Sequence, residues 1–160
     1  MTTITGSVTR TIAAEPDAVF AAITDVAALP SWNGRMTAVV EQPPALVPGA
    51  DWVVRFRVFG RSWDSRSTVV ELDVAKRLFT FVTGTDDGNP SRATWTWEVA
   101  DTSGGSQVTV RWELHPVTFW RRVLLGRIRA RQLARDEVPR SLEALTTKLA
   151  SVPASPRRRE

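Results

Sequence analysis

The chain has 160 residues, of which 42% are hydrophobic and 24% are charged, with a net charge of +4, a balance typical of one globular domain. It contains no cysteine and a single histidine, which excludes disulfides, thiolate nucleophiles and cysteine-ligated clusters and argues against a zinc site. We therefore expect no metal and no cofactor, and, because we see neither a secretion signal nor a membrane-spanning apolar run, a cytoplasmic protein.

The first part of the chain predicts a strand followed by two short helices. Residues 3–12 are rich in Thr, Val and Ile and alternate loosely, as in a strand. Pro16 and its acidic neighbours are typical of a helix start, and Phe20 and Ile23 lie at helical spacing. Residues 25–29 predict a second helical turn, because a proline follows them directly.

Between residues 35 and 115 the pattern changes to strands that are separated by short turns. Trp95 and Trp97 alternate with polar residues, and Trp112 does the same in the next strand. Such period-two patterning predicts an antiparallel meander with one apolar face, which we expect to point at a C-terminal helix. The expected strands are residues 36–41, 51–59, 62–73, 78–84, 94–99 and 108–114.

A long helix is predicted from about residue 117 to 150. Its buried stripe consists of Val138, Leu142, Leu145 and Leu149. Pro139 lacks the N–H of the i−4 bond, so we expect a bend around residues 135–139 and the widest part of a cavity, with its entrance, near residues 133–138. Residues 151–160 predict a disordered basic tail.

Four segments resemble the helix-grip superfamily, which includes START-like lipid-binding domains, birch-pollen-allergen-like proteins and bacterial polyketide cyclase-like proteins. They are residues 13–20, 25–32, 70–78 and 141–145. The third departs from the family in having Val74 and Ala75 where a double proline is usual at the turn. The resemblance implies an α+β fold with a seven-stranded curved antiparallel sheet wrapped around a long C-terminal helix, two short helices after the first strand, and a single domain over residues 1–150.

The resemblance also implies a function. The first interpretation is that the domain binds a hydrophobic or aromatic small molecule in an internal sheet–helix cavity, with cofactor-independent polyketide cyclase- or aromatase-like activity as its catalytic form. The alternative is a non-catalytic interaction module, similar to chaperone-activator domains, that acts through the basic C-terminal helix. A closed core filled by tryptophans would favour the second interpretation.

The chain has seven tryptophans, which either fill the core or line a ligand cavity. We expect ligand contacts from aromatic side chains on the predicted apolar faces and from one residue of the helix stripe. These residues are Trp52, Phe56, Trp95, Trp97, Trp112 and Val138.

Three polar residues are candidates for catalysis. Unbroken alternation in residues 62–73 would place Asp64 and Arg66 on the inner face with Val70 and Leu72, as a buried pair. A β-bulge near Ser67 would instead turn both charges outward and Trp63 inward, and we favour this second arrangement. His115, at the end of the last strand, is the best general-base candidate, although a histidine there is more commonly a surface residue.

Six arginines within 15 residues make the start of the long helix strongly basic: Arg121, Arg122, Arg127, Arg129, Arg131 and Arg135. A solvated helix face explains them best, so we expect no nucleic-acid partner. Apolar residues between the arginines leave peripheral contact with anionic lipid as an alternative.

Overall fold

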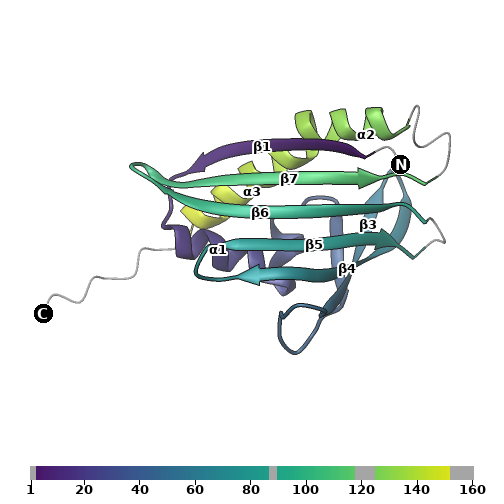
Figure 1. The fold of residues 1–160 in the computed structure, drawn as a ribbon, viewed down its shortest axis with the longest axis horizontal. Coiled ribbons are helices and arrows are strands. Elements are labelled where there is room, and N and C mark those ends of the chain that lie inside the picture. Colours follow the sequence, from purple (N-terminus) through teal and green to yellow (C-terminus); the bar gives the residue numbers. More distant parts are fainter. Residues whose placement is uncertain (1–2, 87–89, 118–124, 152–160) are drawn as a thin grey trace, which may run out of the picture.

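The computed structural model describes residues 3–86, 90–117 and 125–151. Seven antiparallel strands form one sheet in the order β1-β7-β6-β5-β4-β3-β2, so strands β2 to β7 are a meander and β1 closes its far side against β7 (Figure 1). The strands are β1 (Ile4–Ile12), β2 (Met36–Glu41), β3 (Asp51–Val58), β4 (Arg61–Asp73), β5 (Leu78–Thr85), β6 (Arg92–Thr102) and β7 (Gly105–His115).

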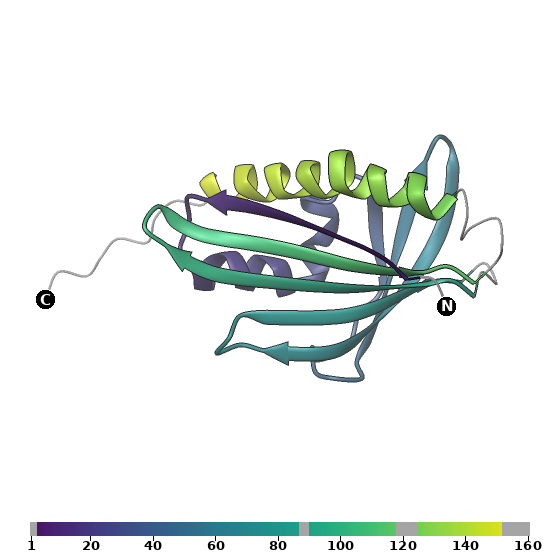
Figure 2. The same ribbon diagram turned by 45° about the horizontal axis from the view of Figure 1, so that its top comes forward.

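The helical elements lie on the concave face of this sheet (Figure 2). Helix α1 (Pro16–Thr24) and the 3-10 helix η1 (Val26–Ser31) follow β1, and the C-terminal helix consists of α2 (Gly126–Gln132), a π-helical turn η3 (Leu133–Glu137) and α3 (Val138–Ala150). The predicted helix-grip α+β fold is confirmed. Residues 118–124 of the predicted helix, Trp120 among them, and residues 152–160 of the predicted tail lie outside the described residues.

The core lies between the sheet and the helices. Trp97 and Val99 of β6 and Trp112 of β7 are between 1% and 8% exposed, so the apolar strand faces point inward as predicted. From the helix, Leu142 and Leu145 are at most 1% exposed and belong to the same cluster. The inward-facing side chains of the strands and the buried stripe of the helix thus pack together in one layer.

In strand β4, the inward-facing positions change once along the strand from odd-numbered to even-numbered residues. Ser65, Ser67 and Val69 are buried, whereas Val70 is 54% exposed. The pairing with β5 shifts between Val69 and Glu71, so one extra residue is accommodated there and Leu72 returns to the core side. The bulge therefore lies at Val70 and not near Ser67 as expected, and of Val70 and Leu72 only Leu72 lies on the core side.

The C-terminal helix is irregular just before its proline, where a bend was expected. The π-helical turn spans Leu133–Glu137, and Pro139 is the second residue of α3. A proline is tolerated in the first turn of an α-helix, because backbone N–H groups there have no acceptor within that helix. In an α-helix, residues five apart point about 140° away from each other. The π turn holds one extra residue, so Leu133 and Val138, five residues apart, face the same side of the helix. Both are buried, at 1% and 5% exposed.

Candidate functional site

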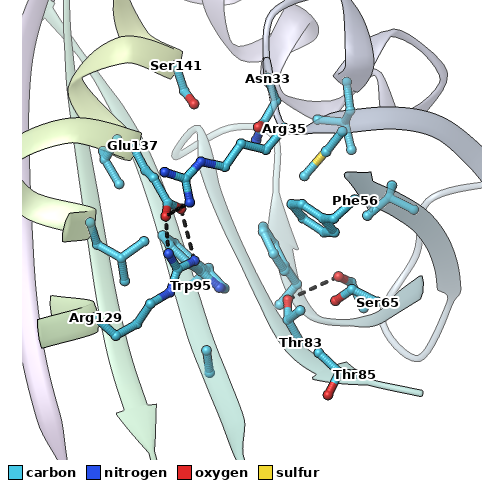
Figure 3. A pocket seen from close by; sticks show the side chains of 18 of the residues that line it. Asn33, Arg35, Phe56, Ser65, Thr83, Thr85, Trp95, Arg129, Glu137 and Ser141 are labelled. Carbon is cyan, nitrogen blue, oxygen red and sulfur yellow. Dashed lines mark hydrogen bonds and ion pairs between the residues drawn. The ribbon is translucent and has the colours of Figure 1, made fainter. Parts of the chain in front are cut away.

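A cavity of about 940 Å³ separates the sheet from the C-terminal helix. Inward side chains of β3, β4, β5 and β6 form one wall, and α2, the π turn and α3 form the other (Figure 3). The volume lies in the range that binds drug-sized organic molecules in proteins. The π turn contributes Leu133 and Glu137 to the lining, so the segment with the expected bend does border the cavity.

Aromatic rings dominate the deep part of the cavity. The Trp52 ring lies 5.9 Å from Phe79 and 5.0 Å from Phe81, measured between centroids, and Trp32 meets Trp97 edge to face at 5.7 Å. These contacts hold the rings against one another at the cavity wall.

Five of the six expected ligand-contact residues line this cavity: Trp52, Phe56, Trp95, Trp97 and Val138. Trp112 does not. Its ring is 1% exposed, lies 6.0 Å from Trp95 and covers Gly6 of the neighbouring strand so closely that a Cβ there would come within 2.4 Å of Trp112 Cζ2. Trp112 is therefore core packing behind the cavity wall.

Hydroxyl groups from β4 and β5 form a polar band on the sheet wall. Ser65 Oγ donates to the Gly84 carbonyl oxygen at 3.2 Å, and the Ser67 and Thr83 hydroxyls are 3.0 Å apart. All three side chains line the cavity, although the two serines are almost fully buried. Sequence reasoning missed them, yet turning Asp64 and Arg66 outward already places Ser65 and Ser67 inward by alternation.

A charged bridge crosses the cavity between the helix and the segment before β2. Glu137, on the π turn, accepts hydrogen bonds from Arg35 and from Arg129 of α2 (Figure 3). Next to it, Asp136 contacts Arg35 at 3.6 Å and Arg140 at 2.7 Å. From the sequence, Arg129 was expected on a solvated or lipid-facing surface, and neither Arg35 nor Glu137 was a candidate for the site. The inward position of Glu137 depends on the π turn, for which the sequence offered only Pro139 as a signal.

The three catalytic candidates lie away from the cavity wall. Asp64 points outward, as favoured, and its carboxylate accepts hydrogen bonds from Arg55 at 2.8 and 3.0 Å, which lower the pKa of Asp64. Arg66, also outward, contacts Glu41 at 3.2 Å. His115 is 41% exposed on its side chain, with Nε2 at 3.4 Å from Thr94 Oγ1. The buried Asp64–Arg66 pair that unbroken alternation would give is not formed.

Within residues 3–86, 90–117 and 125–151, no group of three or more His, Cys, Asp or Glu side chains could hold a metal ion. In the same ranges, no helix is long and apolar enough to cross a membrane. Of the basic helix, Arg127, Arg129, Arg131 and Arg135 are described, whereas Arg121 and Arg122 lie outside the described residues. Contact of this helix with anionic lipid stays a prediction.

A family model described as "Polyketide cyclase / dehydrase and lipid transport" matches residues 3–150. The chain belongs to this family. No curated protein matches the chain. Among solved structures, Ara h 8.0201 has a TM-score of 0.73 at 15% identity, with 94% of this chain and 100% of the other covered.

Two further solved structures agree with the family's fold. Ginseng major latex-like protein 151 from Panax ginseng has a TM-score of 0.72 at 12% identity, covering 94% of this chain and 99% of its own. The di-domain ARO/CYC StfQ of the steffimycin biosynthetic pathway has a TM-score of 0.76 at 12% identity, and the match covers 92% of this chain and 51% of StfQ. At these identities the likeness establishes the helix-grip fold alone.

Proposed function

We propose that this member of the family binds a hydrophobic or aromatic small molecule in the cavity between sheet and helix. The observation that carries the proposal is the 940 Å³ cavity itself, with an aromatic lining and a few placed polar groups. Burying a ligand there would remove apolar surface from water, at about 25 cal/mol per Å² on the ligand and wall.

The same cavity argues against the alternative function. A non-catalytic interaction module would need only its surface, and a core filled by its tryptophans would serve it well. Here Trp52, Trp95 and Trp97 line the cavity instead of closing it. An unfilled core weakens a domain, because every void gives up packing contacts. A cavity of this size is therefore more readily explained by an occupant.

The geometry favours binding over any particular reaction, because Asp64, Arg66 and His115 do not line the cavity. Cyclase- or aromatase-like chemistry would have to use other groups, and the lining offers Glu137 and the hydroxyls of Ser67 and Thr83. Such a pocket would contribute to a rate chiefly by holding a flexible chain in a reactive conformation. Binding is the step that both the carrier and the cyclase forms of the function share.

The proposal is tested with the neutral fluorescent probe N-phenyl-1-naphthylamine. Ala93 lines the cavity from β6, whereas Ala100 is exposed on the same strand. We expect the unmodified protein to bind one probe molecule. Ala93→Trp, which fills the cavity, should weaken binding at least about tenfold, corresponding to 1.4 kcal/mol. Ala100→Trp, the matched control, should leave the affinity unchanged.

Two results would contradict the proposal. One is failure of the unmodified protein to bind the probe at all. The other is equal affinity in the Ala93→Trp and Ala100→Trp proteins, which would place the probe on the surface. Native mass spectrometry of the protein as purified adds an independent readout, since a co-purified ligand would appear as a discrete mass increment that Ala93→Trp reduces.

A further inference from the structure

Among the charged side chains that line the cavity, guanidinium groups outnumber carboxylates. Three guanidinium groups surround two carboxylates in the bridge, so the cluster carries one positive charge in excess. Its members are Arg35, Arg129, Arg140, Asp136 and Glu137, and all of them line the cavity. Arg92, a fourth guanidinium of the lining, has no ion-pair partner among the residues described.

The carboxylate in the middle of this cluster is its most enclosed member. The Glu137 side chain is 15% exposed, against 36% for Arg35 and 44% for Arg129. Each guanidinium has five N–H donors, and Glu137 accepts one from Arg35 and two from Arg129. Both arginines therefore keep N–H donors that a second anion could accept in charge-assisted hydrogen bonds.

The π turn is what brings this arrangement together. Residues seven apart share one face of an α-helix, since seven residues make about two turns. Arg129 and Glu137 are eight apart, and the extra residue of the π turn stacks them so that Glu137 Oε2 lies 2.9 Å from Arg129 Nη2. Glu137 then holds Arg129 and Arg35 side by side at the cavity lining, one from the helix and one from the opposite segment.

We propose that Arg35 and Arg129, positioned by Glu137, bind the anionic group of an amphiphilic ligand whose apolar body occupies the aromatic part of the cavity. This inference rests on the proposed function and deepens it by naming the ligand class, an apolar or aromatic acid. One anionic group on the ligand would balance the surplus charge of the cluster. The hydroxyl band of Ser65, Ser67 and Thr83 lies on the opposite wall and is available to neutral oxygen atoms of the same ligand.

Two probes with one skeleton test the inference. 1-Anilinonaphthalene-8-sulfonate is N-phenyl-1-naphthylamine with an added sulfonate, so the ratio of their affinities isolates the anionic group. We expect the unmodified protein to prefer the sulfonate at least about fivefold, and the preference to fall as salt is raised. Arg129→Gln and Arg35→Gln should each abolish the preference, so that the ratio of the two affinities falls to about one.

Arg127→Gln is the matched control, because it removes the same charge from the exposed side of α2, outside the cavity lining. It should keep the preference. The inference is overturned, with the proposed function intact, if the unmodified protein binds both probes equally well. It is also overturned if Arg127→Gln reduces the preference as much as Arg129→Gln does, or if the two cavity variants weaken both probes equally. Absence of binding by either probe would instead remove the proposed function together with this inference.

Discussion

The two ends of the layer between sheet and helices belong to one continuous sheet but are filled differently. At one end, Val99 and Val108 of the sheet belong to one core cluster with Val19 of α1 and with Leu142 and Leu145 of α3. All five side chains are at most 2% exposed. At the other end the cavity lies between the sheet and α2, the π turn and the first half of α3. The same fold thus provides a tightly packed half that maintains stability and an unfilled half that is free to take a ligand.

The change occurs within single strands. Along the inner face of β5, Phe79 and Phe81 are followed by Thr83, and along β4 Val69 is preceded by Ser67 and Ser65. The backbone register continues without interruption between Phe81 and Thr83. Phe79, Phe81 and Thr83 all line the cavity, and the small hydroxyl side chains fill less space than the aromatic rings beside them. The cavity therefore gains width along the strands without any change of topology.

The largest effect is expected at the packed end. Leu145 is 0% exposed and lies in the core cluster. Leu145→Ala should lower the free energy of unfolding by about 2–5 kcal/mol through lost burial and a new void. Urea unfolding measures this change, while the affinity for N-phenyl-1-naphthylamine should stay within about twofold under folding conditions. A comparable loss of probe affinity would mean that the two ends are not independent.

An intermediate effect is expected at Gly6, where the strand faces Trp112. A Cβ at this position would lie 2.4 Å from Trp112 Cζ2, closer than any real contact allows. Gly6→Ala should therefore cost about 1–3 kcal/mol of stability, since the buried ring can move only by disturbing its neighbours. Ser7→Ala, at an exposed position of the same strand, is the control. If Gly6→Ala is as stable as the control, Trp112 is mobile and could approach a ligand after all.

Much of this organisation could be predicted from the sequence, because local residue patterns determine strands and their faces. Contacts between residues far apart in the sequence leave no such pattern. Strand-forming residues, alternation and turn signals located the seven strands of the described sheet, and Trp95 and Trp97, which were expected to contact a ligand, line the cavity. The bulge at Val70 was misplaced because one inserted residue is consistent with several positions in an alternating pattern. The charged bridge was missed because it joins Arg35 to Glu137 across 102 positions and depends on a π turn.

The smallest effect concerns the outward-facing pair Arg55–Asp64. The side-chain hydrogen bond from Arg55 lowers the pKa of Asp64, so the folded state favours the ionised carboxylate. The stabilisation is fully present above the ordinary aspartate pKa of the unfolded chain and is lost as pH falls through the lowered pKa of the folded state. Asp64→Asn should thus be slightly less stable than the unmodified protein at pH 7, with the difference vanishing at the acid end.

Melting temperatures measured from pH 7 down to strongly acidic solution check this prediction. Asp25→Asn is a suitable control, because Asp25 forms no ion pair within the described ranges. Exposed pairs contribute little on average, so the shift should be small in comparison with that of Leu145→Ala. A difference that persists unchanged at the acid end would show that Asp64 acts through something other than its charge.

The central claim is that a ligand enters the cavity and leaves the core side chains behind the cavity wall undisturbed. The indole N–H signals of the tryptophans report this directly in a two-dimensional ¹H–¹⁵N spectrum recorded during titration with N-phenyl-1-naphthylamine, with each signal assigned by Trp→Phe substitution. The account predicts large saturable shifts for the cavity residues Trp63, Trp95 and Trp97, and a much smaller shift for Trp112, which does not line the cavity. Saturable shifts that are largest at Trp112, or no shifts at the three cavity residues, would contradict it.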